Sequence, residues 1–252
     1  MRMTHTTGPV WLLLACLLPA SVLAEEENAP ATFEGVYEAR YGSLRAEAER
    51  NLRYDDAQAQ YTMESVIGLS LLGANVASIT ERSTFTWSPE AGVEPLSYDY
   101  IHKGIGARNR GARFDLEQDR ATFHVDEDTG ELPLDGPVFD PLNAYLKVQY
   151  ALAAGTTDIK LQVLDRDEIE LFHFRVIDEE TLDTRLGPYT TLHLERVRDA
   201  GSKRQTDIWV APALAFMLVK LVQEEPNGRT ISLDLKQATL NGQPVTGTVG
   251  AE

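Results

Sequence analysis

Residues 44–65 read LRAEAERNLRYDDAQAQYTMES, and this stretch decides the fold class. Small or apolar residues alternate with polar ones on both sides of Asp55 and Asp56, which supply a turn. Alternation on both sides of a turn is typical of a β-hairpin with one face in solvent. In the first predicted strand the small or apolar set, which we call the apolar phase, is Leu44, Ala46, Ala48, Leu52 and Tyr54. In the second predicted strand the corresponding set is Ala59, Tyr61, Met63 and Ser65.

The same period of two recurs outward from this hairpin along most of the chain. We expect further strands over residues 37–41, 79–87, 96–102, 114–116, 121–125, 159–163, 172–176, 192–194, 208–210 and 231–235. Residues 68–73 (GLSLLG) are apolar and bounded by glycine, which favours a short packed connection. Glu225–Gly228 is typical of a hairpin turn. The chain is therefore predicted to be mainly β, with a curved antiparallel sheet.

One helix interrupts the strands, near residues 140–153. Asp140 can cap its start, Pro141 suits the first helical position, and Gly155 closes the segment. Its apolar stripe consists of Leu142, Tyr145, Leu146, Tyr150 and Ala153. Residues 214–222 (LAFMLVKLV) are apolar on both faces of a strand, so something must cover them, and this helix is the natural candidate.

The N-terminus indicates export. Residues 10–22 form an apolar run that is too short for a spanning helix, and Val22-Leu23-Ala24 offers a cleavage site, so residues 1–24 are predicted to be a signal peptide. The alternative is lipidation at Cys16, although Leu13-Leu14-Ala15-Cys16 is a poor lipoprotein box. We expect a flexible leader over residues 25–32, a single β-rich domain over 33–240 and a C-terminal tail over 241–252, located in the periplasm.

Composition excludes several classes of function. Cleavage would remove Arg2 and no acid, leaving 22 basic and 39 acidic residues and a net charge of −17. Such a surface repels nucleic acid and anionic headgroups. The only cysteine is Cys16, so the mature chain would have no disulfide and no thiolate. No second long apolar run exists, which predicts no transmembrane helix in the mature chain.

Catalytic and metal motifs are missing. The sequence has no G-x-S-x-G, H-E-x-x-H, P-loop or S-x-x-K pattern, and a triad assembled from distant strands is left open. Four histidines (His102, His124, His173 and His193) lie in strand patterns without metal-ligand spacing, although a sheet could bring His173 and His193 together. The acidic stretches 126–131, 165–168 and 178–180 are interpreted as solvated turns. We therefore expect no catalytic residues, metal or cofactor.

The most unusual local feature is residues 103–113 (KGIGARNRGAR), a basic, glycine-rich segment in an acidic chain. It is interpreted as a loop that either holds an anionic group or is simply a solvated hairpin tip. Together with the aromatic residues of the helix and of the apolar strand, it supplies the candidate ligand-binding residues, which are Arg108, Arg110, Arg113, Tyr145, Tyr150 and Phe216.

The order of several short motifs resembles a known family. These are an early aromatic strand (37–41), Glu64-Ser65, GLSLLG, Glu81-Arg82-Ser83 with Phe85, Pro95-Leu96-Ser97-Tyr98, Phe114-Asp115, Gly130-Glu131-Leu132-Pro133, Asp140-Pro141-Leu142 followed by Asn143 where serine is usual, Phe174-x-Val176, Asp183-Thr184-x-Leu186-Gly187 and Ile208-Trp209-x-Ala211-Pro212. From about residue 33 to 237 the chain resembles the uncharacterised exported proteins of Gram-negative bacteria of the domain of unknown function 3108 family. The resemblance implies a β-roll or unclosed β-barrel, similar in outline to periplasmic lipoprotein carriers, and it supplies no catalytic residues.

The sequence leaves three functions open. The first is a periplasmic envelope protein that binds a lipid-like or hydrophobic small molecule in a groove between sheet and helix, unless sheet and helix simply fill each other. The second is a non-enzymatic interaction module that binds an envelope protein. A hydrolase with an unrecognised site is the third and least favoured.

Overall fold

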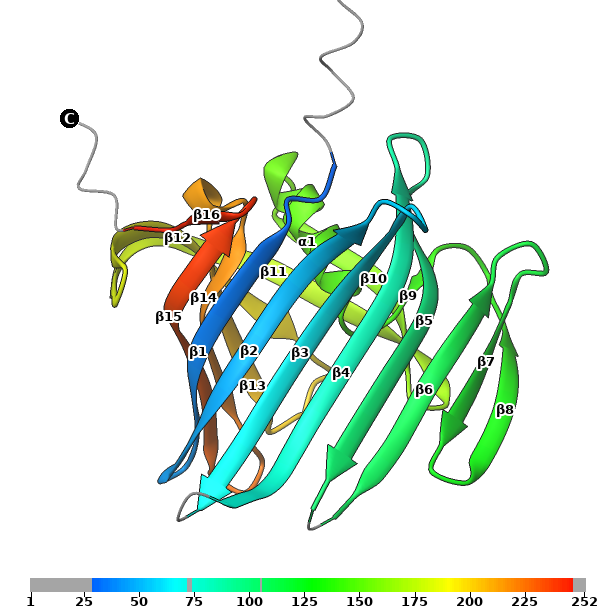
Figure 1. Ribbon diagram of the computed structural model, residues 1–252, viewed down its shortest axis with the longest axis horizontal. Coiled ribbons are helices and arrows are strands. Elements are labelled where there is room, and N and C mark those ends of the chain that lie inside the picture. Colours follow the sequence, from blue (N-terminus) through cyan, green and yellow to red (C-terminus); the bar gives the residue numbers. More distant parts are fainter. Residues whose placement is uncertain (1–28, 72–73, 105, 247–252) are drawn as a thin grey trace, which may run out of the picture.

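The computed structural model describes residues 29–71, 74–104 and 106–246, and these form one large β-sheet (Figure 1). The strands of its first half are β1 (Phe33–Tyr41), β2 (Leu44–Asp55), β3 (Gln60–Leu71), β4 (Ala74–Ser88), β5 (Gly92–Lys103), β6 (Arg108–Asp115), β7 (Arg120–Val125), β8 (Asp128–Pro133) and β9 (Val138–Phe139). Those of the second half are β10 (Asp158–Asp165), β11 (Glu168–Thr184), β12 (Gly187–Val197), β13 (Gln205–Ala211), β14 (Met217–Glu224), β15 (Thr230–Leu240) and β16 (Gln243–Pro244).

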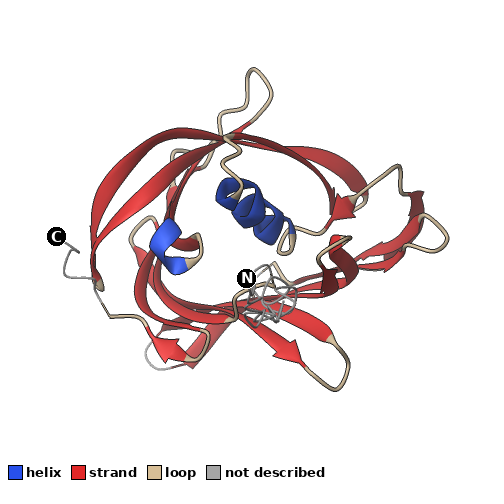
Figure 2. Cartoon of the chain, turned by 90° about the horizontal axis from the view of Figure 1, so that it is seen from above, coloured by secondary structure: helices blue, strands red, loops and turns tan. Residues whose placement is uncertain are grey.

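The sheet is antiparallel except where β9 joins β10. Its order is β8-β7-β6-β5-β4-β3-β2-β1-β15-β14-β13-β12-β11-β10-β9, with β16 beside β15. β1 thus pairs with both β2 and β15 and joins the two halves. Seen from above, the sheet curls into a ring whose two ends, β8 and β9, are not paired with each other (Figure 2). The predicted unclosed antiparallel barrel is confirmed.

Alternation decides which residues face the inside of the ring. Tyr37 and Ala39 of β1 are buried, whereas Glu38 and Arg40 point outward. In β2, Ala48 and Leu52 are buried between exposed or half-buried polar residues. Pairing places Tyr37 opposite Ala48, so that the buried phases of adjacent strands lie on one face. The inward side chains therefore form the core.

Helix α1 (Ala144–Ala153) lies inside this ring (Figure 2). It begins four residues later than the first residue predicted. The Asp140 side chain caps the preceding turn, because its Oδ1 accepts hydrogen bonds from the backbone N–H groups of Leu142 and Asn143. Leu142, Leu146 and Leu152 are buried, and Tyr145 and Tyr150 are half-buried, but Ala153 is exposed, contrary to the predicted stripe.

The apolar segment 214–222 is covered from two sides. Its first residues belong to a 3-10 turn, η2 (Pro212–Leu214), and to the residues that lead into β14. On the inside, Gln149 of α1 donates a hydrogen bond of 3.0 Å to the Phe216 carbonyl. On the outside, Leu182 and residues 183–185 at the end of the β11–β12 hairpin border a hollow together with Val219 and Lys220 of β14. Arg185 also forms an ion pair of 2.7 Å with the outward-facing Glu38 of β1. The helix alone is therefore not the cover that the sequence predicts.

Three segments that the sequence predicts to be turns or connections are parts of strands in the structure. Residues 68–71 of GLSLLG belong to β3, residues 108–113 of the basic segment belong to β6, and residues 178–180 belong to β11. Each pairs with a neighbouring strand: Gly68 lies opposite Ser78, Arg110 opposite Tyr100, and Asp178 opposite His193. The register shifts between Leu69 and Ser70 and between Val176 and Asp178, but the pairing resumes on both sides of each shift. Backbone pairing across a long sheet outweighs the local preference of glycine and aspartate for turns.

Some expectations fall outside the described residues, namely the predicted signal peptide and the first half of the predicted leader. Within the described part of the chain, no helix is long and apolar enough to cross a membrane. The predicted turn at Glu225–Gly228 is confirmed, since the Glu225 N–H donates to the Arg229 carbonyl.

Candidate functional site

A hollow of about 390 Å³ opens at the end of the ring where β1, β3 and β5 end and β2, β4 and β6 begin, the lower end in Figure 1. We call it the lower hollow. Its walls are mostly hydrocarbon, from Ala39, Ala46, Ile67, Leu69, Ala77, Ile79, Ile231 and Leu233. At its mouth Tyr41 and Leu44 are 38% and 43% exposed. Apolar side chains left in solvent around a concave apolar surface are typical of a binding site.

The charges around the lower hollow have one sign. Arg40 and Arg45 border it, His102 lies in its wall, and no carboxylate is among the described residues that line it. Both arginines belong to the exposed phase of their strands, and Arg40 is paired with Glu38 on the outer face. The lower hollow therefore offers an apolar chain a wall of hydrocarbon, with basic groups only at its border.

A second, smaller hollow of about 230 Å³ lies between α1 and the sheet, and we call it the upper hollow. Leu146, Tyr150 and Ala153 of the helix border it on one side. Residues 29–31, Phe33, Leu214, Ala215, Phe216, Met217 and Leu240 contribute the rest of its wall, together with Gln149. Helix and sheet thus fill most of the space between them. Of the aromatic candidates, Tyr150 and Phe216 line this hollow and Tyr145 does not.

The three candidate arginines do not converge on one point. Arg110 faces the inside, where its guanidinium lies 4.0 Å from the centre of the Tyr100 ring and 3.6 Å from the Asp165 carboxylate. Arg113 lies on the other face of β6 and binds Asp99 at 2.8 Å. Arg108 is exposed at the start of β6, opposite His102. Because each has different surroundings, these side chains do not form a shared anion site.

A buried carboxylate joins the helix to the sheet. Asp140 Oδ2 accepts a hydrogen bond of 2.6 Å from the Ser83 hydroxyl, and Oδ1 accepts the two backbone N–H groups that cap the turn. Burial raises the pKa of Asp140 to about 7, against the hydrogen bonds that favour its charged form. Nearby, the Tyr98 hydroxyl donates a hydrogen bond of 2.7 Å to Glu81. These groups hold α1 in place, since Asp140 immediately precedes its first turn.

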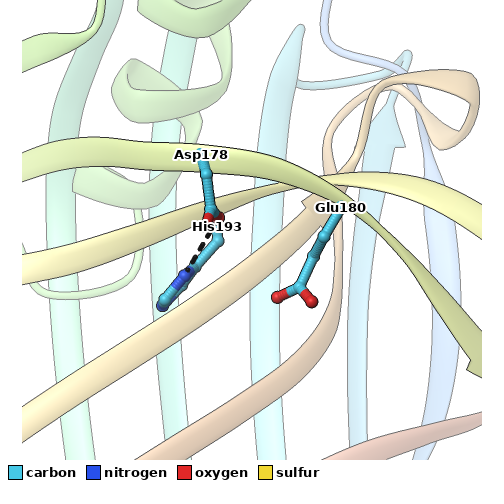
Figure 3. Close-up of side chains that lie close together, drawn as sticks. All are labelled: Asp178, Glu180 and His193. Atoms are coloured by element: carbon cyan, nitrogen blue, oxygen red, sulfur yellow. Dashed lines mark ion pairs between the residues drawn. The ribbon is translucent and has the colours of Figure 1, made fainter.

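Among the described residues, Asp178, Glu180 and His193 form the arrangement closest to a metal site (Figure 3). The His193 ring lies between two carboxylates, with Nδ1 3.3 Å from Asp178 and Nε2 2.9 Å from Asp207. Glu180 accepts a hydrogen bond from the Trp209 indole, which stacks on the His193 ring at 4.5 Å. Each ring nitrogen of His193 thus already has a carboxylate of the chain beside it. His173 lies opposite Val197, away from His193, and contacts Asp158 instead.

The sequence matches the family described as protein of unknown function (DUF3108) over residues 36–236. The chain belongs to this family. The match supports the order of motifs noted in the sequence. The family description names no activity, so it assigns no functional site. A search of curated proteins finds no match.

A solved structure has the same fold. It is the β-barrel-like protein of domain of unknown function DUF1849 from Brucella abortus, which is 8% identical, with a TM-score of 0.56. The alignment covers 83% of this chain and 98% of the other. At this identity the likeness shows the fold alone, which is the β-barrel-like sheet described above.

Sequence reasoning missed the lower hollow, because its wall comes from strands distant along the chain. One signal was present in the hairpin that decides the fold. Arg50 lies in the apolar phase of residues 44–54, between Ala48 and Leu52, and so faces the inside of the ring. A charged residue in an apolar phase marks an inward polar group, as Glu81 does in β4 between Ile79 and Ser83.

Proposed function

We propose that this protein is an exported envelope protein that binds a single-chain, lipid-like ligand in the lower hollow. The observation that carries the proposal is the wall of this hollow, which is formed mostly by apolar side chains of several strands and, among the described residues, by no carboxylate. Its volume of about 390 Å³ lies in the range of small-molecule sites, about 300–1,000 Å³, whereas the upper hollow falls below it. The predicted signal peptide supports a periplasmic location, where such a ligand would be met.

Burial of hydrocarbon supplies the driving force for this binding. Each methylene group that leaves water contributes about 0.8 kcal/mol. The wall is built on strands of one continuous sheet, from β1, β2, β3, β4, β5 and β15, so it is largely preformed. A rigid concave wall loses little conformational entropy when it binds.

The proposal is tested with a long-chain fatty acid, palmitate, added to delipidated protein in a calorimetric titration. Ala46→Trp and Ala77→Trp place a large ring in the lower hollow from two different strands. Each should weaken binding at least about tenfold, because the ring occupies the space of the acyl chain. Glu49→Trp is the matched control, since Glu49 is exposed on the outer face of the same strand as Ala46.

Circular dichroism shows whether the variants keep the fold of the wild type. Loss of binding in folded Ala46→Trp or Ala77→Trp, with binding kept in Glu49→Trp, supports the proposal. Wild-type protein that binds no palmitate, or two hollow-filling variants that bind it as tightly as the wild type, would rule it out.

A further inference from the structure

Arg50 is an inward-facing arginine at the middle of the sheet. It lies on the same face of β2 as the buried Ala48 and Leu52. Its neighbours in register are Gly35 on β1 and Ser65 on β3, so small residues flank it on both sides. A guanidinium turned into a core carries a large desolvation cost unless a partner of opposite charge is present.

No such partner is found among the described residues. Arg50 forms no ion pair there, and the acceptor nearest to its Nη2 is the sulfur of Met63 at 3.9 Å, a weak interaction. Its Nε is buried without a hydrogen-bond partner. The guanidinium carbon lies 4.3 Å from the centre of the Tyr145 ring, a cation–π contact that leaves the N–H groups unused.

Tyr145 also carries a polar group that lacks a hydrogen-bond partner among the described residues. Its hydroxyl is buried and has no hydrogen-bond partner. Burial raises the pKa of Tyr145 well above its usual range, against the opposing effect of the Arg50 charge, so this hydroxyl is a donor at every physiological pH. Tyr37, which also lies near Arg50, differs because its hydroxyl donates to the Leu218 carbonyl at 3.0 Å. Arg50 and Tyr145 thus place two unused donors close together.

The acids of the core are already engaged. Glu81 lies in the same transverse row as Arg50, with Ser65 between them, but it accepts the Tyr98 hydroxyl. Asp140 is held by Ser83 and the backbone. The other inward arginine of this row, Arg110, has Asp165 beside it. Among the described residues no carboxylate is bonded to the Arg50 guanidinium or the Tyr145 hydroxyl, and two adjacent donors suit one anion supplied by a ligand.

We propose that Arg50 and Tyr145 bind the carboxylate of a long-chain fatty acid whose hydrocarbon chain extends down the lower hollow to its mouth. This inference rests on the proposed function and adds the headgroup and its direction. On β2 the lining of the lower hollow ends at Ala46, and the buried Ala48, with only a methyl group, separates it from Arg50. A headgroup at Arg50 therefore requires the side chains around Ala48 to move apart when the ligand binds. From Leu44 at the mouth to Arg50 the strand runs about 20 Å, a span suited to an extended acyl chain.

The test compares palmitate with its methyl ester, which keeps the chain but lacks the charge. Wild-type protein should bind the acid at least about tenfold more tightly than the ester, the effect of one charge-assisted hydrogen bond. Arg50→Met should lose this preference and keep its affinity for the ester. Tyr145→Phe, which removes only the hydroxyl, should reduce the preference in the same direction and covers the case in which Arg50→Met does not fold.

Two arginines of the same strand serve as comparisons. Arg53→Met is the matched control, because Arg53 is exposed and pairs with Glu34 on the outer face. Arg45→Met tests the alternative that the carboxylate of the ligand binds at the mouth of the lower hollow, because Arg45 borders that opening. Loss of the acid preference in Arg45→Met, with the preference kept in Arg50→Met, would reverse the direction of the ligand and overturn the inference.

A failure of this inference can be distinguished from a failure of the proposed function. Equal binding of acid and ester by the wild type, or an acid preference that survives in both Arg50→Met and Tyr145→Phe, overturns the inference and leaves the proposed function intact. Absence of binding for both ligands overturns the proposed function as well. An acid preference that is lost in Arg50→Met and reduced in Tyr145→Phe, but kept in Arg45→Met and Arg53→Met, supports the inference.

Discussion

The Ser83 hydroxyl lies 2.6 Å from Oδ2 of Asp140, and both residues are fully buried. This bond links β4 to the turn that precedes α1, across 57 positions of sequence. The helix makes few backbone contacts with the sheet around it, so this buried carboxylate is a specific anchor between the two. Two predictions follow from its chemistry.

The first concerns pH. The pKa of Asp140 is about 7 in the folded chain and near 3.8 when unfolded. Between these values the folded state holds a proton that the unfolded state has released, so the free energy of unfolding falls as pH rises. The contribution is complete below about pH 4 and is lost by about pH 7, at roughly 1 kcal/mol per pH unit. Asp140→Asn should lack this slope in urea denaturation at pH 5, 6, 7 and 8.

Asp135→Asn is the control for that series, because Asp135 is exposed five residues earlier. It should keep the slope of the wild type. Parallel pH profiles for wild type and Asp140→Asn would show that this carboxyl group does not hold its proton in the folded state.

The second prediction concerns the hydroxyl of Ser83. Ser83→Ala should lower the free energy of unfolding by about 1.5–3 kcal/mol at pH 8, where Asp140 is charged, and by less at pH 5. The reason is that a hydrogen bond to a charged group is stronger than one to a neutral group. Ser43→Ala, in the exposed β1–β2 turn, is the control. An equal effect of Ser83→Ala at both pH values would contradict the predicted charge of Asp140.

The sequence was sufficient for the fold class because alternation is a local signal. The hairpin of residues 44–65 and the helix near 140–153 could be found from residues close together along the chain. The position of the helix inside the ring could not, since it depends on how sixteen paired strands curl. The same holds for Arg50, whose surroundings come from α1 and from β1 and β3 as well as from its own strand.

The glycine-rich residues 103–113 are predicted to form a loop, and for residues 108–113 this prediction is wrong for a physical reason. Gly111 lies in β6 opposite His124 of β7. There its missing side chain makes room for a neighbour. A sequence shows that glycine permits a turn, but it does not show that a partner strand needs the space.

The third prediction concerns the packing of the helix. Leu146 is 3% exposed on the face of α1 that meets the core. Leu146→Ala should lower the free energy of unfolding by about 2–5 kcal/mol, because it leaves a cavity inside the ring. Leu171→Ala is the matched control, since Leu171 is 62% exposed, and its effect should be small. Thermal melts of both variants check this, and equal melting temperatures would show that Leu146 does not pack in the core.

The fourth prediction concerns processing. N-terminal sequencing of protein recovered from the periplasm should begin at Glu25, because Val22-Leu23-Ala24 follows a single apolar run. An acylated Cys16 at the N-terminus would contradict this and would place the protein on a membrane anchor instead.

The fifth prediction concerns Gly111. A Cβ atom added there would lie 2.5 Å from the His124 ring and 2.7 Å from the Tyr98 carbonyl oxygen. The carbonyl belongs to the neighbouring strand and cannot rotate away, so Gly111→Ala must push β6 from β5. We expect a loss of about 1–3 kcal/mol in the free energy of unfolding, the usual cost of overpacking. Gly68→Ala is the matched control within a strand, because a Cβ there meets nothing within 4 Å. Urea denaturation of the two variants measures the difference, and a Gly111→Ala variant as stable as Gly68→Ala would show that β6 does not lie in this register against β5.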